Sequence, residues 1–267
     1  MALLEVENVR RCFGGLVALD RVTFQVHAGQ IKGLIGPNGA GKTTLFNVIS
    51  GLQRCDTGRV LFKDRLISQL APYQIARRGM SRTFQNPSLF LQISVLENVM
   101  VGRHRQSRSE FAACAFRFKG QRREERRIRD AALAHLEGMG LVELSDVPAG
   151  SLAFGQRRMV ELVRALATEP ELLLLDEPAS GLTTKEKEEL GEHIRRIRDR
   201  GITILLVEHD MSLVMDLSDD ILVLDNGVPL AEGPPAAIQT NPQVIRVYLG
   251  GEFHHAVVGP ESALRLR

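Results

Sequence analysis

The sequence predicts an α/β fold in which buried parallel strands alternate with helices. Three observations support this class. Residues 172–175 and 202–207 are continuous apolar runs, which are typical of parallel strands covered on both faces. The first thirty residues alternate apolar and polar side chains, which predicts half-exposed antiparallel strands. Residues from about 87 to 165 show helical spacing instead, which predicts a helical subdomain inserted into the core.

Composition excludes several classes of protein. The chain has 267 residues and a net charge of only +2, so no broad basic surface for nucleic acid or an anionic membrane is expected. Cys12, Cys55 and Cys114 lack metal-ligand spacing and fit a reducing compartment better than a disulfide framework. No apolar run approaches the roughly twenty residues of a membrane span, and acidic Glu5 comes too early for a secretory leader. We therefore expect no transmembrane segment and no signal peptide.

A motif from residue 36 to residue 44 has the spacing Gly, four residues, Gly-Lys-Thr. An apolar strand over 31–35 precedes it, and a helix is expected from about Lys42. Glycines let successive N–H groups turn toward an anion, the helix N-terminus adds its positive dipole, and the Thr43 hydroxyl suits magnesium. A glycine-rich turn that binds nothing is the alternative, and the strand-loop-helix context argues against it. The residues expected at the phosphates are Gly36, Asn38, Gly39, Ala40, Gly41, Lys42, Thr43 and Thr44.

Two carboxylates follow the apolar strand 172–175. Asp176 and Glu177 stand where ligands bind at the carboxyl end of a parallel strand. Asp176 is placed to support magnesium, and Glu177 to orient and deprotonate an attacking water. Helix capping before Pro178 is the alternative, which the phosphate loop in the same chain makes the weaker one.

A histidine follows the next strand. A charged helix over 185–200 connects the two strands, so residues 202–207 end at the same sheet edge and bring His209 there. A histidine alone is more often structural, but at this edge it could hydrogen-bond a γ-phosphate and the attacking water.

Two further segments carry weaker predictions. Gln85 ends an extended segment and could join the magnesium shell through its amide oxygen, although a lone glutamine is usually a surface residue. Residues 151–158 form a glycine-containing loop before an apolar helix expected over 159–167, which makes a second anion site. Since one loop already holds one side of a nucleotide, the second suggests a partner's nucleotide.

A basic stretch occupies residues 117–127. It could contact nucleic acid or lipid phosphates. A solvated helical face, with Glu124 and Glu125 as local partners, is the favoured interpretation, because no aromatic platform is interleaved beyond Phe118.

Taken in order, these motifs resemble the ATP-binding subunits of ABC transporters over nearly the whole chain. The resemblance implies a P-loop NTPase (RecA-like) core with an N-terminal antiparallel β subdomain and an inserted α-helical subdomain. It also implies ATP and Mg2+ as cofactors and a head-to-tail pair of ATPase domains that share each nucleotide. The features that carry it are the phosphate loop, Gln85, the signature loop 152–156, Leu175-Asp176-Glu177, the loop 180–183 and His209.

The resemblance also implies roles for individual residues. Phe13 matches the aromatic on which adenine stacks; otherwise it is a half-buried strand residue. The implied catalytic residues are Glu177, His209, Lys42 and Gln85; the implied metal residues are Thr43, Gln85 and Asp176; the implied signature contacts to nucleotide are Ala153, Gly155 and Gln156.

Two departures from the family pattern stand out. Ala153 replaces the usual signature serine, which removes a hydroxyl and keeps the backbone donors around Gly155. Thr183 stands where aspartate or asparagine is common, which puts the coupling between subunits at that loop in question.

Finer features look like the branched-chain amino-acid uptake ATPases. These are residues 14–20, Arg82-Thr83-Phe84-Gln85, the alanine-bearing signature, 208–211 and the terminal segment 241–250. We expect one ABC ATPase domain over 1–252 and a tail over 253–267. Related urea or amide importers and lipopolysaccharide exporters remain alternatives, followed by a soluble ABC ATPase acting on nucleic acid or ribosomes, a kinase, and a structural nucleotide-binding module.

The resemblance implies partners and a location. The partners are transmembrane permease subunits, a second identical or homologous ATP-binding subunit and, indirectly, a periplasmic or extracellular substrate-binding protein, with no nucleic acid. The implied location is peripheral, on the cytoplasmic face of the bacterial cytoplasmic membrane.

Overall fold

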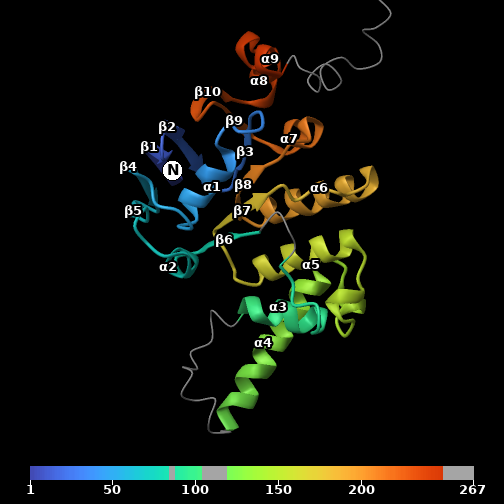
Figure 1. The fold of residues 1–267 in the computed structure, drawn as a ribbon. Coiled ribbons are helices and arrows are strands. Elements are labelled where there is room, and N and C mark those ends of the chain that lie inside the picture. Colours follow the sequence, from blue (N-terminus) through green and yellow to red (C-terminus); the bar gives the residue numbers. More distant parts are fainter. Residues whose placement is uncertain (84–87, 104–118, 249–267) are drawn as a thin grey trace, which may run out of the picture.

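The computed structural model describes residues 1–83, 88–103 and 119–248, apart from the side chains of 119–122. Within these residues the strands form two sheets. The four-stranded sheet has the order β2-β1-β4-β5, and the six-stranded sheet has the order β10-β9-β3-β8-β7-β6. Figure 1 shows the helices distributed around these sheets. The expected α/β class with an N-terminal antiparallel layer is confirmed.

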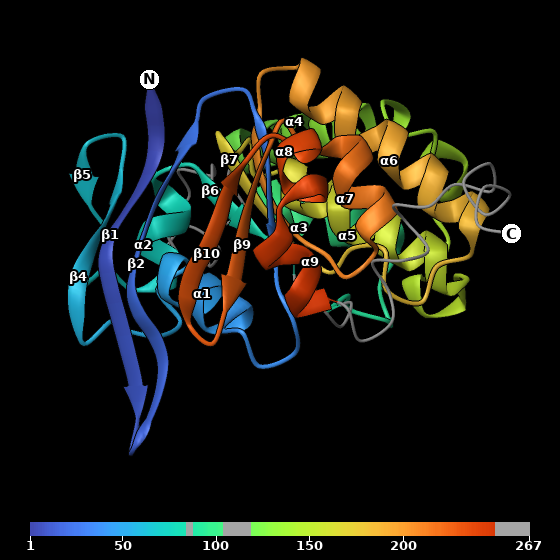
Figure 2. The same ribbon diagram turned by 90° about the horizontal axis from the view of Figure 1, so that it is seen from above.

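The four-stranded sheet is antiparallel. A long hairpin joins β1 (Ala2–Phe13) to β2 (Leu16–His27), and its free end projects past the rest of the sheet (Figure 2). Strands β4 (Thr57–Phe62) and β5 (Arg65–Leu66) complete it. Leu4 and Val6 of β1 are fully buried, as the period of two predicts, and a register shift between Val6 and Val9 moves the next buried position to Val9.

The six-stranded sheet is mostly parallel. Its central strands β3 (Ile31–Ile35), β7 (Leu172–Asp176) and β8 (Thr203–Val207) are buried along their whole length. In β7 successive leucines face opposite sides, so Leu172 and Leu174 join one hydrophobic core and Leu173 and Leu175 join the other. The remaining strands are β6 (Met80–Arg82), β9 (Asp220–Asp225) and β10 (Val228–Gly233), of which only β10 pairs antiparallel.

Helices cover both faces of this sheet. Helix α1 (Lys42–Ile49) packs in the core that the two sheets share. Helices α5 (Phe154–Leu166) and α6 (Thr184–Asp199) pack in the core on the opposite face. The others are α2 (Pro72–Arg77), which precedes β6, α7 (Met211–Leu217), α8 (Pro235–Thr240) and α9 (Pro242–Tyr248).

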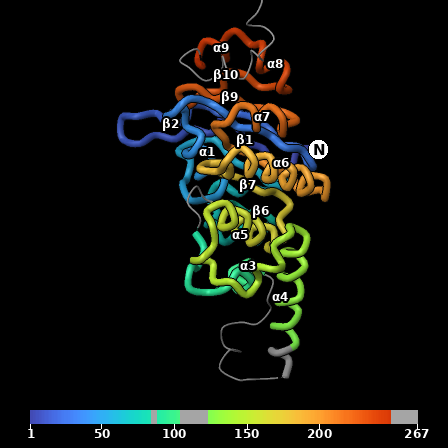
Figure 3. Tube along the Cα trace, turned by 90° about the vertical axis from the view of Figure 1, so that its right-hand side faces the viewer, coloured from blue at the N-terminus to red at the C-terminus, as the bar shows by residue number. Residues whose placement is uncertain are grey.

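The insertion contains the helices that the sequence predicts. Helices α3 (Val95–Arg103), α4 (Lys119–Glu137) and α5 gather at one end of the molecule (Figure 3), with the short turns η3 (Val142–Leu144) and η4 (Ala149–Ser151) between α4 and α5. Buried apolar side chains of α3 and α4 meet in one core. The domain limits 1–252 and 87–165 stay predictions.

One helix boundary was predicted wrongly. The segment expected as a loop over 151–158 is largely helical, because α5 begins at Phe154 and not near Met159. The Gln156 side chain accepts the Ala153 N–H at 3.0 Å and closes the first turn of α5. Two arginines follow directly, so the apolar spacing that indicates a helix does not extend back to this turn.

Within the described ranges no helix is long and apolar enough to cross a membrane. Cys12 and Cys55 are free thiols there. Cys114, Gln85 and the predicted tail 253–267 lie outside the described residues.

Candidate functional site

The loop between β3 and α1 has the backbone that an anion cradle requires. Gly39 and Gly41 take φ angles of +82° and +99°, a region that side chains disfavour. The loop is also tightly enclosed: a Cβ on Gly41 would lie 2.6 Å from the Ala18 carbonyl oxygen, and one on Gly36 would lie 2.2 Å from that of Leu224. Glycine is therefore required at both ends of the loop.

Lys42 is the first residue of α1 and is 6% exposed. Its Nζ donates to the carbonyl oxygens of Gly36 (2.6 Å) and Pro37 (2.9 Å). Burial lowers the pKa of this ammonium, and the nearby charge of Glu177 opposes that shift. The side chain thus folds back over the loop and places its positive charge against the loop carbonyls.

A cavity of about 410 Å³ opens over this loop. Most of the predicted nucleotide residues share it, together with apolar side chains of the β1–β2 hairpin that the sequence analysis did not assign. Its lining residues are Phe13, Leu16, Val17, Ala18, Asn38, Gly39, Ala40, Gly41, Lys42, Thr43, Thr44, Glu177, His209 and Asn226. Phe13 is 41% exposed, and the Arg11 guanidinium lies 4.8 Å from its ring centroid.

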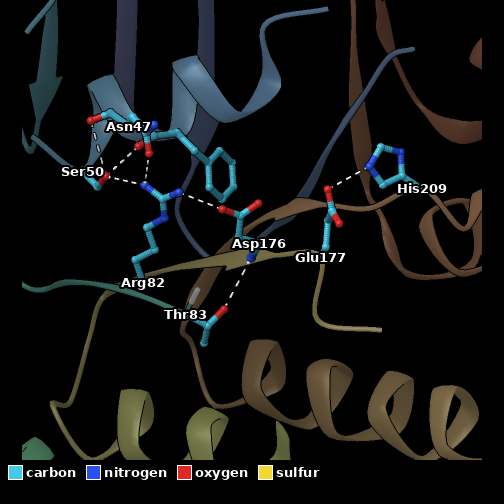
Figure 4. A network of polar contacts seen from close by, with 8 residues as sticks. Asn47, Ser50, Arg82, Thr83, Asp176, Glu177 and His209 are labelled. Atoms are coloured by element: carbon cyan, nitrogen blue, oxygen red, sulfur yellow. Dashed lines mark hydrogen bonds and ion pairs between the residues drawn. The ribbon is translucent and has the colours of Figure 1, made fainter. Parts of the chain in front are cut away.

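Glu177 and His209 meet at the edge of this cavity (Figure 4). Glu177 Oε1 lies 2.8 Å from His209 Nε2, and the Glu177 backbone N–H donates to the Val207 carbonyl at 2.9 Å. Because β7 and β8 are parallel neighbours, their carboxyl ends bring the two side chains together. Glu177 also takes a φ of +47°, a left-handed conformation that aims a non-glycine side chain away from the strand direction.

The buried carboxylate of Glu208 holds the backbone next to this pair. It is 3% exposed and accepts the backbone N–H groups of Ala179 (2.6 Å) and His209 (3.0 Å). Burial raises the pKa of its carboxyl, and these hydrogen bonds act in the opposite direction. The sequence analysis assigned no role to Glu208, although it is a carboxylate directly after a buried strand.

Asp176 is 5% exposed and lies beside Glu177 at the end of β7. Its Oδ2 accepts a 2.7 Å hydrogen bond from Arg82 Nη2, and its backbone N–H donates to the Thr83 hydroxyl at 3.4 Å. Arg82 also reaches α1 (Figure 4). The sequence analysis used Arg82 only as a family feature, since its contacts are separated by more than thirty residues.

The donors beside the loop fit a magnesium ion. Thr43 lines the cavity with a hydroxyl, and Asp176 Oδ1 has no hydrogen-bond partner in the part of the chain that the structure describes. Among the described residues, no group of three or more histidine, cysteine, aspartate or glutamate side chains is arranged to hold a metal ion without other ligands. A hydroxyl and one carboxylate are the hard oxygen donors that Mg2+ uses when substrate phosphates supply the rest.

The predicted signature residues lie apart from this cavity. Ala153 and Gln156 are exposed at the N-terminus of α5, and Gly155 is buried against α6. A Cβ on Gly155 would lie 2.2 Å from Oε1 of Glu186. Ala153, Gly155 and Gln156 are not among the lining residues of the phosphate cavity.

Thr183 stabilises the start of α6, the helix against which Gly155 is buried. It is the N-cap of α6: its N–H and hydroxyl donate to Glu186 Oε2, each at 2.8 Å, and its hydroxyl accepts the Glu186 N–H. Arg158, a further residue without a predicted role, donates to the carbonyl of Glu177 at 3.4 Å. Helix α5 is thereby connected to the Glu177 backbone close to its N-terminus.

The turn between β9 and β10 braces the phosphate loop. Gly227 donates its N–H to the Ala40 carbonyl at 3.0 Å and accepts the Asp20 N–H at 2.8 Å. Its neighbour Asn226 lines the cavity. The Asn-Gly pair after an apolar run is a hairpin pattern that could have located this turn in the sequence.

Comparison with known proteins identifies the family. The chain matches a family model described as ABC transporter over residues 19–180. It is 43% identical over 249 residues to the high-affinity branched-chain amino acid transport ATP-binding protein BraF of Pseudomonas aeruginosa, covering 93% of this chain and 98% of that protein. The chain belongs to the ABC transporter ATP-binding family. Further matches of this ABC ATPase include proteins named for branched-chain amino acid transport.

A second family model, described as branched-chain amino acid ATP-binding cassette transporter, matches residues 228–254. The corresponding protein LivG of Escherichia coli K12 is 44% identical over 249 residues, with 93% of this chain and 98% of LivG covered. The crystal structure of the ADP conformation of MJ1267, an ATP-binding cassette of an ABC transporter, superposes with a TM-score of 0.82 at 34% identity, covering 94% of this chain and all of that one. The expected family, fold class and ATPase assignment are confirmed.

Proposed function

We propose that this ABC ATPase binds ATP with magnesium and hydrolyses it to drive a transporter that imports branched-chain amino acids. One observation carries the catalytic part: a phosphate loop with a buried lysine shares its cavity with the Glu177–His209 pair. The cargo is inferred from the C-terminal family match and from the relatives BraF and LivG, which are named for branched-chain amino acid transport.

The residues divide the chemistry between them. Lys42 and the loop N–H groups hold the β- and γ-phosphates and offset their charge. Glu177 accepts a proton from the attacking water, which lies between its carboxylate and the γ-phosphate. His209 donates a hydrogen bond to the γ-phosphate while its contact with Glu177 keeps that carboxylate in place. Phe13 stacks on the adenine, with Leu16 and Val17 beside it.

Thr43 and Asp176 would hold the magnesium ion, with Gln85 as a further ligand. When bound, the ion would offset the negative charge of the phosphates. Thr43 is the second residue of α1 and lines the cavity, and Asp176 ends β7 directly before Glu177, which also lines it. The two donors therefore come from different elements.

The assembly follows from the residues that lie outside the cavity. Ala153, Gly155 and Gln156 would contact the nucleotide of a second ATP-binding subunit, identical or homologous, in a head-to-tail pair. Permease subunits would supply the transmembrane helices, and a substrate-binding protein would deliver the amino acid to them. The chain would lie on the cytoplasmic face of the bacterial membrane and bind no nucleic acid.

Replacing the proposed base tests the function. In Glu177→Gln the side chain keeps its size and loses the ability to accept the water proton, so we expect ATP turnover to fall by about two to four orders of magnitude while ATP stays bound. Phosphate release and retained nucleotide are measured on the same sample. Glu189→Gln, on the exposed face of α6, is the matched control. A Glu177→Gln protein that hydrolyses ATP at the wild-type rate would rule out the assignment.

The cargo needs a separate test. The chain is co-expressed with candidate permease and substrate-binding subunits of a branched-chain amino acid transporter, and ATP turnover is measured in proteoliposomes. We expect leucine, isoleucine or valine to stimulate turnover. Stimulation by urea or amides alone, or export of a lipid, would replace the amino-acid assignment and keep the ATPase.

A further inference from the structure

Arg82 is a buried cation that connects two parts of the site. It is the last residue of β6, and its side chain is 8% exposed. Nη1 donates to Asn47 Oδ1 and to Ser50 Oγ, both at 2.8 Å, and Nη2 donates to Asp176 Oδ2 at 2.7 Å. Asn47 belongs to α1 and Ser50 follows its last residue. One guanidinium therefore joins the phosphate-loop helix to the carboxylate at the end of β7 (Figure 4).

The surroundings give this connection a fixed geometry. The guanidinium carbon lies 5.5 Å from the ring centroid of Phe46, which is fully buried. A planar guanidinium offers its donors in a rigid fork, so its position on the ring sets the directions in which it donates. Each of the two Nη atoms has its own anchor, one on α1 and one on Asp176.

The next residue holds the backbone of the same aspartate. Thr83 accepts the Asp176 N–H with its hydroxyl at 3.4 Å, and its own N–H donates to the Leu174 carbonyl at 3.0 Å. Two successive residues, Arg82 and Thr83, thus hold the side chain and the main chain of Asp176. Arg82 Nη2 takes Oδ2, and Oδ1 is left without a hydrogen bond from any described residue.

We propose that Arg82 is a positioning residue for the metal carboxylate: it fixes Asp176 relative to α1 so that Oδ1 serves the magnesium ion that accompanies ATP. The proposal rests on the proposed ATPase function. Arg82 acts through Asp176, because its Nη2 donates to Asp176 Oδ2 while its Nη1 is held by α1.

Charge and geometry predict opposite results for removing Arg82. By charge alone, loss of a nearby cation strengthens binding of Mg2+. By geometry, loss of the partner that orients a metal ligand weakens it, typically by ten- to a hundredfold. A buried arginine that serves only the fold would leave the Mg2+ requirement unchanged once the protein is folded. The Mg2+ requirement therefore separates the three possibilities.

The test compares nucleotide binding with and without magnesium. Binding of a fluorescent, non-hydrolysable ATP analogue to Arg82→Gln is measured in EDTA and then over a Mg2+ titration. We expect the Mg2+ concentration for half-maximal enhancement to rise about tenfold, with the EDTA affinity unchanged. Arg82→Lys keeps the charge but not the fork and is expected to show most of the same rise. Arg77→Gln, at the exposed end of α2, is the matched control.

Three results would overturn the proposal. These are a Mg2+ requirement that is unchanged in Arg82→Gln, one that is lowered, and an equal loss of affinity with and without Mg2+. If Arg82→Gln does not fold, the double change Asn47→Ala with Ser50→Ala removes only the anchor on α1; a raised Mg2+ requirement supports the proposal and an unchanged one overturns it. Wild-type protein that binds no nucleotide in Mg2+ would contradict the ATPase function itself.

Discussion

Two helix N-termini in this chain were expected to bind phosphate, and the structure makes them very different. Helix α1 begins after Gly41 and α5 begins after Ala153, and neither has a side-chain cap from that residue. Around α1 the left-handed loop closes over the helix end, Lys42 folds across it, and a cavity of about 410 Å³ lies above. We therefore expect the first region to bind phosphate by itself.

The N-terminal end of α5 is more open, because Ala153, Phe154 and Gln156 are exposed there. Ala153 has extended backbone, and Gln156 satisfies its N–H. Phe154 is 42% exposed, and the first turn of α5 packs against Glu186 of α6. A helix dipole therefore makes a self-contained anion site only where other residues of the same chain also enclose the helix end. The second region is better suited to contact another molecule than to enclose a ligand by itself.

The largest effect expected is confined to the first region. Lys42→Ala removes the buried ammonium over the loop, and turnover should fall by about a hundredfold or more, as for loss of other preorganised charge stabilisers. ATP affinity and phosphate release are both measured. Lys63→Ala, at an exposed ion pair with Glu171, is the control. Near-normal turnover in Lys42→Ala would contradict the distinction between the two regions.

Glu208 joins the regions, because it holds both His209 and the loop at Ala179. Glu208→Gln leaves one of these N–H groups without an acceptor, which should cost about 2 kcal/mol of stability. Burial raises the carboxyl pKa above 4.5, so the folded state holds a proton that the unfolded state has lost, and stability falls as pH rises through that window.

This component of the pH dependence should vanish in Glu208→Gln. Thermal unfolding is recorded from pH 4.5 upward for wild type, for Glu208→Gln and for Glu143→Gln, an exposed control on η3. Identical pH slopes for wild type and Glu208→Gln would contradict the assignment.

We expect recognition of the adenine base to belong to the first region alone. Phe13→Ala removes the ring at the mouth of the cavity, and ATP affinity should fall about tenfold, the equivalent of roughly 1.4 kcal/mol for one stacking contact. Affinity for inorganic triphosphate should not change. Phe13→Tyr retains the ring and is the control. Equal losses for ATP and triphosphate would show that the hairpin shapes the loop and does not contact the base.

The smallest effect is expected in the second region. Gly155→Ala would place a Cβ 2.2 Å from Glu186 Oε1 and push that carboxylate away from the cap of α6 at Thr183. Loss of such a cap costs about 1 kcal/mol, seen as a small drop in Tm. ATP binding to the isolated chain should be unchanged, and a loss of affinity would place the signature turn at the chain's own nucleotide.

The first region could be predicted because its parts are consecutive. A strand, a glycine loop, a lysine and a helix follow one another between Ile31 and Ile49, so local spacing defines the site. Asp176, Glu177 and His209 could be added because buried parallel strands bring their carboxyl ends to one edge.

The supporting contacts could not be predicted, since they join segments far apart in the sequence. Arg82 meets Asp176 across 94 positions, and Gly227 reaches back to Ala40. The start of α5 was missed for a different reason: Gln156 caps the first turn where the apolar pattern has not yet begun. Gln85 stays a prediction, because it lies outside the described residues.

The central claim is that the two regions of one chain serve different nucleotides. It is tested by mixing two inactive versions of the chain, one with Lys42→Ala and one with Gly155→Glu, and measuring ATP turnover. In a head-to-tail pair, one mixed dimer carries both defects in one site and none in the other, so activity should return in the mixture. A mixture as inactive as its two components would contradict the account.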